Sequence, residues 1–83
     1  MSKYEPVLSS KALATLLGLT KRKQQELSDI LFRLATLPSQ QGDYSLPDES
    51  GRAIQYLMIG SYVIGFWSDD PVSELRIVEI DLI

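Results

Sequence analysis

The chain has 83 residues, of which 23% are charged, a formal net charge of −3, and neither cysteine nor histidine. These absences exclude disulfides, thiolate chemistry and the commonest general base and metal ligand, so we expect no metal and no cofactor. No segment is long and apolar enough to cross a bilayer, and no charged-then-apolar leader opens the chain, so we expect a cytoplasmic protein without membrane contact. The length predicts a single domain, residues 1–83, with a modest core.

A short strand and a short helix are expected at the start of the chain. Residues 4–8 are typical of a strand, and Pro6 places it at a sheet edge because proline has no amide hydrogen to donate to a neighbouring strand. Ser9 or Ser10 can cap the helix that follows, and Gly18 lies where that helix should end.

A second, longer helix is predicted between Thr20, a favourable N-cap residue, and Pro38, which ends it. Its apolar residues form one stripe at helical spacing: Leu27, Ile30, Leu31, Leu34 and Leu37. The connection at residues 18–20 is so short that the two helices should form an αα-hairpin across one face of a sheet. Residues 39–52 are mostly polar and contain glycine and proline, which predicts a surface loop.

The C-terminal half is predicted to be a three-stranded antiparallel meander. Residues 53–59 and 62–67 are rich in β-branched and aromatic side chains, and the Gly60-Ser61 pair between them is typical of a tight hairpin turn. Asp69-Asp70-Pro71 marks a second turn, and residues 75–83 supply the third strand.

Alternation along these strands predicts which side chains share a face. One set is expected to pack under the helices: Ile54, Tyr56, Met58, Ile64 and Phe66. The other set should lie on the open face: Leu57, Ile59, Val63 and Trp67. Four large apolar side chains exceed what a small monomer normally exposes, so this second set is predicted to bind a partner chain.

Charge is unevenly distributed. Lys21, Arg22 and Lys23 form a basic cluster that we interpret as a solvated first helical turn, whereas residues 69–81 are mostly acidic. An acidic protein gains no general electrostatic attraction to nucleic acid, so any such binding would have to be local.

The chain resembles the RelE/ParE toxin superfamily of bacterial type II toxin-antitoxin systems. The resemblance covers nearly the whole chain and is carried by Val7-Leu8-Ser9, Leu34-Ala35-Thr36-Leu37-Pro38, Gly42-Asp43, Leu46, Gly51-Arg52, Ile59-Gly60-Ser61-Tyr62 and Arg76-Ile77. It implies an α+β fold in which an N-terminal edge strand and an αα-hairpin pack on a C-terminal three-stranded antiparallel sheet. It also implies a cognate antitoxin as partner, a ribosome or DNA gyrase as target, and growth inhibition linked to plasmid stabilization.

The resemblance also implies candidate catalytic residues. Members that resemble ribosome-dependent messenger RNA endonucleases use basic side chains to stabilise the charge that develops on the scissile phosphate, without a metal. This chain has Tyr56, Met58 and Val63 where such members have arginines. The remaining candidates are Arg52, Arg76 and Tyr62.

Each catalytic candidate also has a structural interpretation. Arg52 could pair with Asp48 or Glu49, Arg76 could pair across strands with neighbouring carboxylates, and Tyr62 could be a core or edge residue.

We therefore favour the hypothesis of a toxin, or a degenerate relative of one, that acts and is neutralised through protein contacts and is not an enzyme. One alternative is a ribosome-dependent endoribonuclease that uses the reduced set of candidates. Another is a non-toxic scaffold, a homodimer that buries Leu57, Val63 and Trp67.

Overall fold

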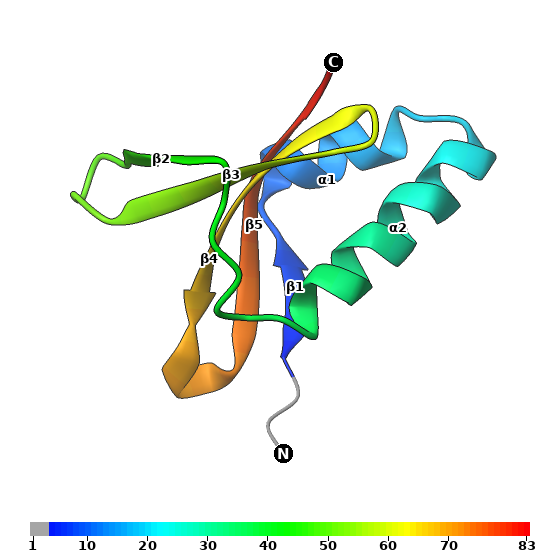
Figure 1. Ribbon diagram of the computed structural model, residues 1–83. Helices are drawn as coiled ribbons and strands as arrows, with labels where there is room; N and C mark the ends of the chain where they lie inside the picture. Colours follow the sequence, from blue (N-terminus) through cyan, green and yellow to red (C-terminus); the bar gives the residue numbers. More distant parts are fainter. Residues whose placement is uncertain (1–3) are drawn as a thin grey trace.

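The computed structural model describes residues 4–83 and shows one five-stranded sheet with two helices (Figure 1). The elements follow the chain as β1 (Glu5–Leu8), α1 (Ser10–Leu17), α2 (Lys21–Ala35), β2 (Tyr44–Pro47), β3 (Ala53–Ile59), β4 (Tyr62–Asp69), the 3₁₀ turn η1 (Asp70–Val72) and β5 (Glu74–Leu82). The sheet order is β1-β5-β4-β3-β2, in which β1 pairs parallel to β5 and all other pairs are antiparallel. The predicted α+β class, edge strand and C-terminal meander are confirmed.

Both helices begin at the caps that the sequence indicates. The Ser9 hydroxyl accepts a hydrogen bond from the Ala12 amide at 3.1 Å, and the Thr20 hydroxyl accepts one from the Lys23 amide at 3.4 Å. Ser9 also donates its hydroxyl hydrogen to the Val78 carbonyl at 2.8 Å, so the start of α1 is fixed to β5. Ser9 directly follows β1, so these contacts fix the position of the helical hairpin on the sheet at the point where the first strand ends.

An irregularity in β5 keeps its apolar side chains on one face. Gly65 pairs with Glu79 and Phe66 pairs with Ile77, which leaves Val78 as an extra residue in the strand, a β-bulge. Ile77 and Ile80 are three positions apart and would face opposite sides of a regular strand, yet both are buried in the same core. The bulge therefore resets the alternation, and the Ser9 hydroxyl satisfies the carbonyl of the extra residue.

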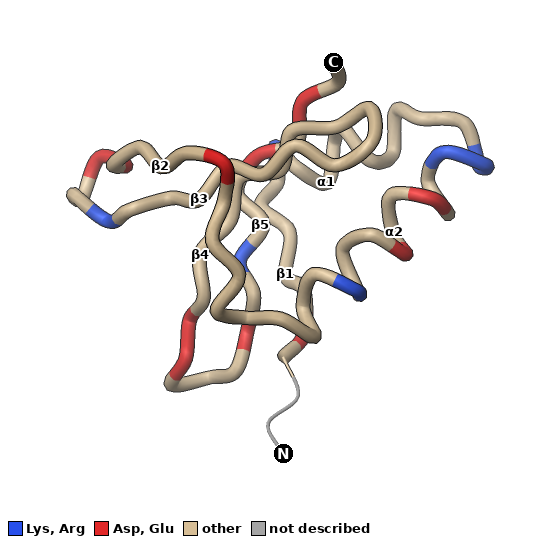
Figure 2. The backbone as a smooth tube through the Cα atoms, in the orientation of Figure 1, with Lys and Arg blue, Asp and Glu red and all other residues tan. Residues whose placement is uncertain are grey.

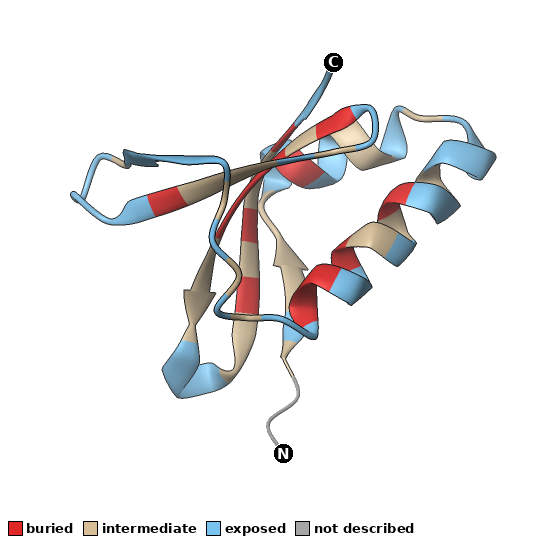
Figure 3. Ribbon diagram, viewed as in Figure 1, coloured by how far each residue is buried: buried red, intermediate tan, exposed pale blue. Residues whose placement is uncertain are grey.

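The core lies between the helices and one face of the sheet. Figure 3 shows buried positions along the side of α2 that faces the strands. Helix residues and strand residues contribute to a single cluster: Ala12, Leu27, Leu31, Leu34, Ala35, Tyr62, Ile64, Phe66, Leu75, Ile77 and Ile80. No helix within residues 4–83 is long and apolar enough to cross a membrane.

The prediction of a surface loop over residues 39–52 is wrong in part, because Tyr44–Pro47 forms β2 at the second edge of the sheet. All four β2 residues are exposed, and only two of them, Tyr44 and Leu46, are large and apolar, so the alternation is too short to indicate a strand. Gly42 lets the chain approach β3 closely. A Cβ atom at Gly42 would lie 2.5 Å from the Tyr56 carbonyl oxygen, which no side chain tolerates.

The predicted faces of β3 are wrong, whereas those of β4 are right. Leu57 pairs with Ile64 and Ile59 pairs with Tyr62, and both β3 residues pack against the helix-side core. Tyr56 and Met58 lie on the opposite face. Ile54 shares that face and is buried outside the helix-side cluster. Apolar residues occupy both sets of alternate positions in β3, so the pattern did not fix which set faces the helices.

Candidate functional site

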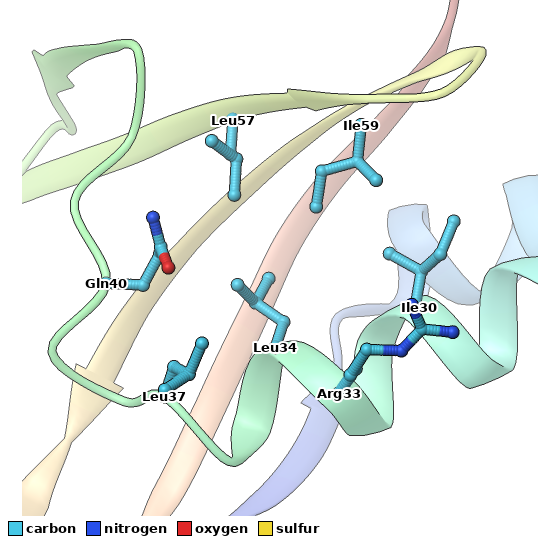
Figure 4. Close-up of a pocket in the computed structure, with 7 residues that line it drawn as sticks. All are labelled: Ile30, Arg33, Leu34, Leu37, Gln40, Leu57 and Ile59. Carbon is cyan, nitrogen blue, oxygen red and sulfur yellow. The ribbon is translucent and has the colours of Figure 1, made fainter.

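An apolar groove separates α2 from β3 and encloses about 180 Å³ (Figure 4). Leu57 and Ile59 point from β3 toward Ile30 and Leu34 on α2, and Leu37 closes one end. Arg33 and Gln40 are the polar residues of the lining. Leu37 is 56% exposed, so an apolar side chain stands open to solvent at the mouth of the groove.

The turn after α2 holds Leu37 in this position. Thr36 caps the helix, the Leu37 amide donates to the Leu34 carbonyl at 3.0 Å, and the Gln40 amide donates to the Leu37 carbonyl at 2.9 Å. The Ser68 hydroxyl of β4 donates to the Pro38 carbonyl and ties the turn to the sheet. The turn that closes this end of the groove is therefore hydrogen-bonded both to the last turn of α2 and to β4.

The chemistry of the groove suits binding rather than bond breaking. Five aliphatic side chains line it, and Arg33 is its one titratable group. A guanidinium remains protonated at all physiological pH values, so it cannot exchange a proton with a substrate. Such a surface can take up the apolar side chains of a peptide or helix, with an acidic group beside Arg33.

Arg52 and Arg76 lie on the other face of the sheet, on either side of Trp67. The Arg52 guanidinium carbon is 3.8 Å from the centroid of the Trp67 ring, and Arg76 is the cross-strand partner of Trp67. Both arginines have carboxylate partners. Arg52 pairs with Asp48 at 3.6 Å.

Arg76 is held between two carboxylates, Asp69 at 3.4 Å and Glu74 at 2.8 Å. Its Nε atom is buried and has no hydrogen-bond partner among the described residues. The positive charge of this side chain is therefore balanced within the protein.

Tyr62 lies on the helix side of the sheet, away from both arginines. Its side chain is 1% exposed, and its hydroxyl donates to a Glu26 carboxylate oxygen at 3.2 Å. Burial raises the pKa of Tyr62, and the Glu26 carboxylate raises this pKa further. Of the three catalytic candidates, the structure brings Arg52 and Arg76 to one face and leaves Tyr62 on the other.

The four predicted partner-binding residues are divided in the same way. Leu57 and Ile59 line the groove, whereas Val63 and Trp67 lie on the open face. The sequence does not predict that Ile30, Leu37 and Gln40 line a binding groove. A signal existed, since the apolar stripe of the second helix continues to Leu37, beyond the last helical residue.

The described residues offer no evident metal site. Within residues 4–83 no group of three or more histidine, cysteine, aspartate or glutamate side chains is arranged to hold a metal ion.

The fold is similar to that of a chain in the toxin-antitoxin complex RelBE2 from Mycobacterium tuberculosis. The two chains superpose with a TM-score of 0.78 over 98% of this chain and 99% of that chain, at 21% sequence identity. No protein-family model matches this chain, and no curated protein matches it by sequence. The likeness confirms the RelE-type fold that the sequence resemblance implied, while function has to be argued from the site.

Proposed function

We propose that this chain is the toxin-type component of a toxin-antitoxin module, acting and neutralised through protein contacts rather than catalysis. The observation that carries the proposal is the open apolar groove between α2 and β3 in a chain with the RelE-type fold. A cognate antitoxin segment would place apolar side chains against Leu37, Leu57 and Ile59. In this proposal the chain works as one domain in the cytoplasm, with the ribosome or DNA gyrase as its target.

The arrangement of the charged side chains supports a non-catalytic role. Stabilising a phosphate requires cationic groups that are free to meet it, and Arg52 and Arg76 are already paired with carboxylates. Tyr62, the third candidate, is buried on the other face of the sheet, and its raised pKa disfavours ionisation. The alternative of a ribosome-dependent endoribonuclease would require these ion pairs to open.

Growth after tightly controlled expression of this chain tests the proposal, with amino-acid and thymidine incorporation followed in the same culture. We expect growth to slow. Early loss of DNA synthesis would identify a gyrase-type target, and early loss of protein synthesis a ribosomal one. Unchanged growth and incorporation would contradict a toxic role in that host. An Arg52→Ala and Arg76→Ala double variant should remain as toxic as the parent, whereas a ribonuclease would lose activity.

The groove itself is tested with a matched pair of substitutions. Leu37→Glu places a charge at the mouth of the groove, and Phe32→Glu places the same charge on α2 at a residue that is 61% exposed and does not line it. We expect coexpression of the cognate antitoxin to restore growth to cells expressing Phe32→Glu but not Leu37→Glu. Equal rescue of both variants would contradict a role for the groove.

The homodimer alternative predicts a different result. A chain that dimerises through its apolar surfaces would show twice the monomer mass by light scattering in the absence of any partner. The proposed function predicts the monomer mass of 9.3 kDa for the isolated chain and a larger mass when the antitoxin is added.

A further inference from the structure

The face of the sheet that the helices leave uncovered has side chains in three cross-strand rows. The register places Leu46, Ile54, Trp67, Arg76 and Val7 in one row across all five strands. The next row contains Tyr44, Tyr56, Gly65 and Glu79, and the third contains Met58, Val63 and Asp81. We call the second and third rows the tyrosine surface.

Two stacked rings form the centre of the tyrosine surface. The Tyr44 and Tyr56 rings are 5.1 Å apart and nearly parallel, at 7°. Tyr56 rests on Gly65, where an added Cβ atom would lie 2.8 Å from a ring carbon. Tyr44 remains 47% exposed and Met58 remains 56% exposed, so both side chains are open to solvent. Val63 is the cross-strand partner of Met58 and adds an apolar side chain beside it. Such groups are enriched at the centres of protein interfaces.

Carboxylates surround these apolar groups. Glu79 and Asp81 belong to the surface, and Asp43 precedes β2 and accepts a hydrogen bond from the Met58 amide at 2.8 Å. Glu79 pairs with Lys11 at 3.4 Å, but the Lys11 side chain is largely exposed, whereas Asp43 and Asp81 form no ion pair within residues 4–83. Burial raises the pKa of Tyr56, and the neighbouring Glu79 carboxylate raises this pKa further.

The basic side chains without an ion pair among residues 4–83 lie on α2, because Arg52 and Arg76 on the open face are paired with carboxylates. Four basic residues and two acidic residues lie on α2, and Figure 2 shows the basic ones at its two ends. An anionic ligand such as RNA is therefore repelled by the tyrosine surface and attracted, if anywhere, to α2. A cationic ligand has the reverse preference.

We propose that the tyrosine surface binds a basic segment of a protein partner, with apolar side chains against Met58 and Val63 and arginine or lysine side chains against Tyr44 and the surrounding carboxylates. The same face already contains one contact between a guanidinium and an aromatic ring, because the Arg52 guanidinium carbon lies 3.8 Å from the centroid of the Trp67 ring. The inference rests on the proposed function, because it takes the occupant to be part of a protein that this chain meets in the cell.

Nuclear magnetic resonance titration of the isotope-labelled full chain tests the surface. The probes are a blocked peptide that alternates arginine and leucine, a blocked peptide that alternates glutamate and leucine, and a uridine oligomer of similar length. We expect the arginine peptide to shift the amide signals of Tyr44, Tyr56, Val63 and Asp81. Equal shifts with the glutamate peptide, shifts of these amides by the RNA, or no shift with the arginine peptide would overturn the proposal.

A charge-matched pair of double variants separates the surface from general attraction. Glu79→Gln with Asp81→Asn should weaken binding of the arginine peptide about fivefold, as expected for one exposed and one partly exposed charge contact. Glu26→Gln with Asp29→Asn makes the same change in net charge on α2 and should leave the affinity unaltered. Equal losses in both pairs would overturn the proposal.

The titration and the growth experiment can reject the tyrosine surface and the proposed function independently of each other. A chain that inhibits growth but does not bind the arginine peptide retains the proposed function and loses this surface. A chain that binds the peptide at the tyrosine surface but leaves growth unchanged retains the surface and loses the toxic role.

Discussion

The groove beside α2 and the tyrosine surface use the same strand in opposite ways. Leu57 and Ile59 of β3 point into the groove, where α2 half-covers them, and Tyr56 and Met58 of the same strand point to the uncovered face. The groove is aliphatic with a cation at its rim, and the tyrosine surface is aromatic with carboxylates around it. One strand thus supplies two surfaces of different chemistry, and the position of α2 decides which side of the strand lines the groove and which side stays uncovered.

The largest expected effect on stability distinguishes two neighbouring residues of β4 whose side chains lie on opposite faces of the sheet. Ile64 is fully buried on the helix side, and Val63 is half-buried on the open side. Ile64→Ala should lower the free energy of unfolding by about 2–5 kcal/mol, because it leaves a cavity in the core. Val63→Ala should cost less than about 1 kcal/mol, because water or neighbouring side chains fill the space. Chemical denaturation measures both, and equal losses would contradict the two-sided description.

A smaller loss of stability is expected for a substitution that disturbs the pairing of β2, the strand that carries Tyr44 of the tyrosine surface. Gly42→Ala would bring a methyl group against the Tyr56 backbone, so the chain must move away from β3 at a cost of about 1–3 kcal/mol. Amide hydrogen exchange should accelerate in β2 and remain slow in β4 and β5. Slowed or unchanged exchange in β2 would show that the close approach at Gly42 is not required.

Removal of Arg76 tests the charge balance of the open face. Arg76→Met should expose Asp69 and Glu74, which are cross-strand partners, to mutual repulsion. We expect a loss of at most about 1 kcal/mol, because these side chains are partly exposed. The loss should shrink in about 1 M salt, where the Debye length is near 3 Å. A loss that does not depend on salt would instead point to packing by the aliphatic part of Arg76.

The smallest effect concerns pH and the helix side. The pKa of Tyr62 is raised in the folded chain, so its contribution to stability is fully present below the ordinary tyrosine value of about 10 and is lost as the pH rises through the folded value. The melting temperature of the parent should therefore fall above pH ~10, and Tyr62→Phe should reduce that fall.

Tyr4→Phe applies the same pH experiment to an exposed hydroxyl, which donates to Asp70 at 2.8 Å. The pKa of Tyr4 is raised by this hydrogen bond, so Tyr4→Phe should also lessen the alkaline fall while leaving the contact between α2 and β4 intact. Identical alkaline profiles for the parent and Tyr62→Phe would contradict the raised pKa of Tyr62.

Local patterns predicted most of the elements correctly. Ser9 and Thr20 cap the helices, Gly60-Ser61 turns the hairpin with Gly60 at a φ of 59°, and Pro6 lies in an edge strand. In each case the cause lies within a few residues, since a side chain either can or cannot supply a cap, a positive φ or an amide donor. β2 was missed for the opposite reason, because its exposed residues become a strand only by pairing with β3.

The candidate site could be predicted less well than the fold. Arg52 and Arg76 were expected to have carboxylate partners as an alternative to catalysis, and both have them. Leu57 and Ile59 were assigned to the open face, but they line the groove. A strand that is apolar on both sides contains no information about which side a helix will cover.

The sequence by itself determined the caps, the turns, the edge position of β1 and the order of the elements other than β2, because these depend on neighbouring residues and on backbone chemistry. Only the tertiary structure decided that α2 lies over the Leu57 and Ile59 side of β3, that Val78 forms a bulge and that Tyr62 points away from both arginines. Those outcomes depend on how distant segments pack to bury the most apolar surface, and that optimum is a property of the whole chain.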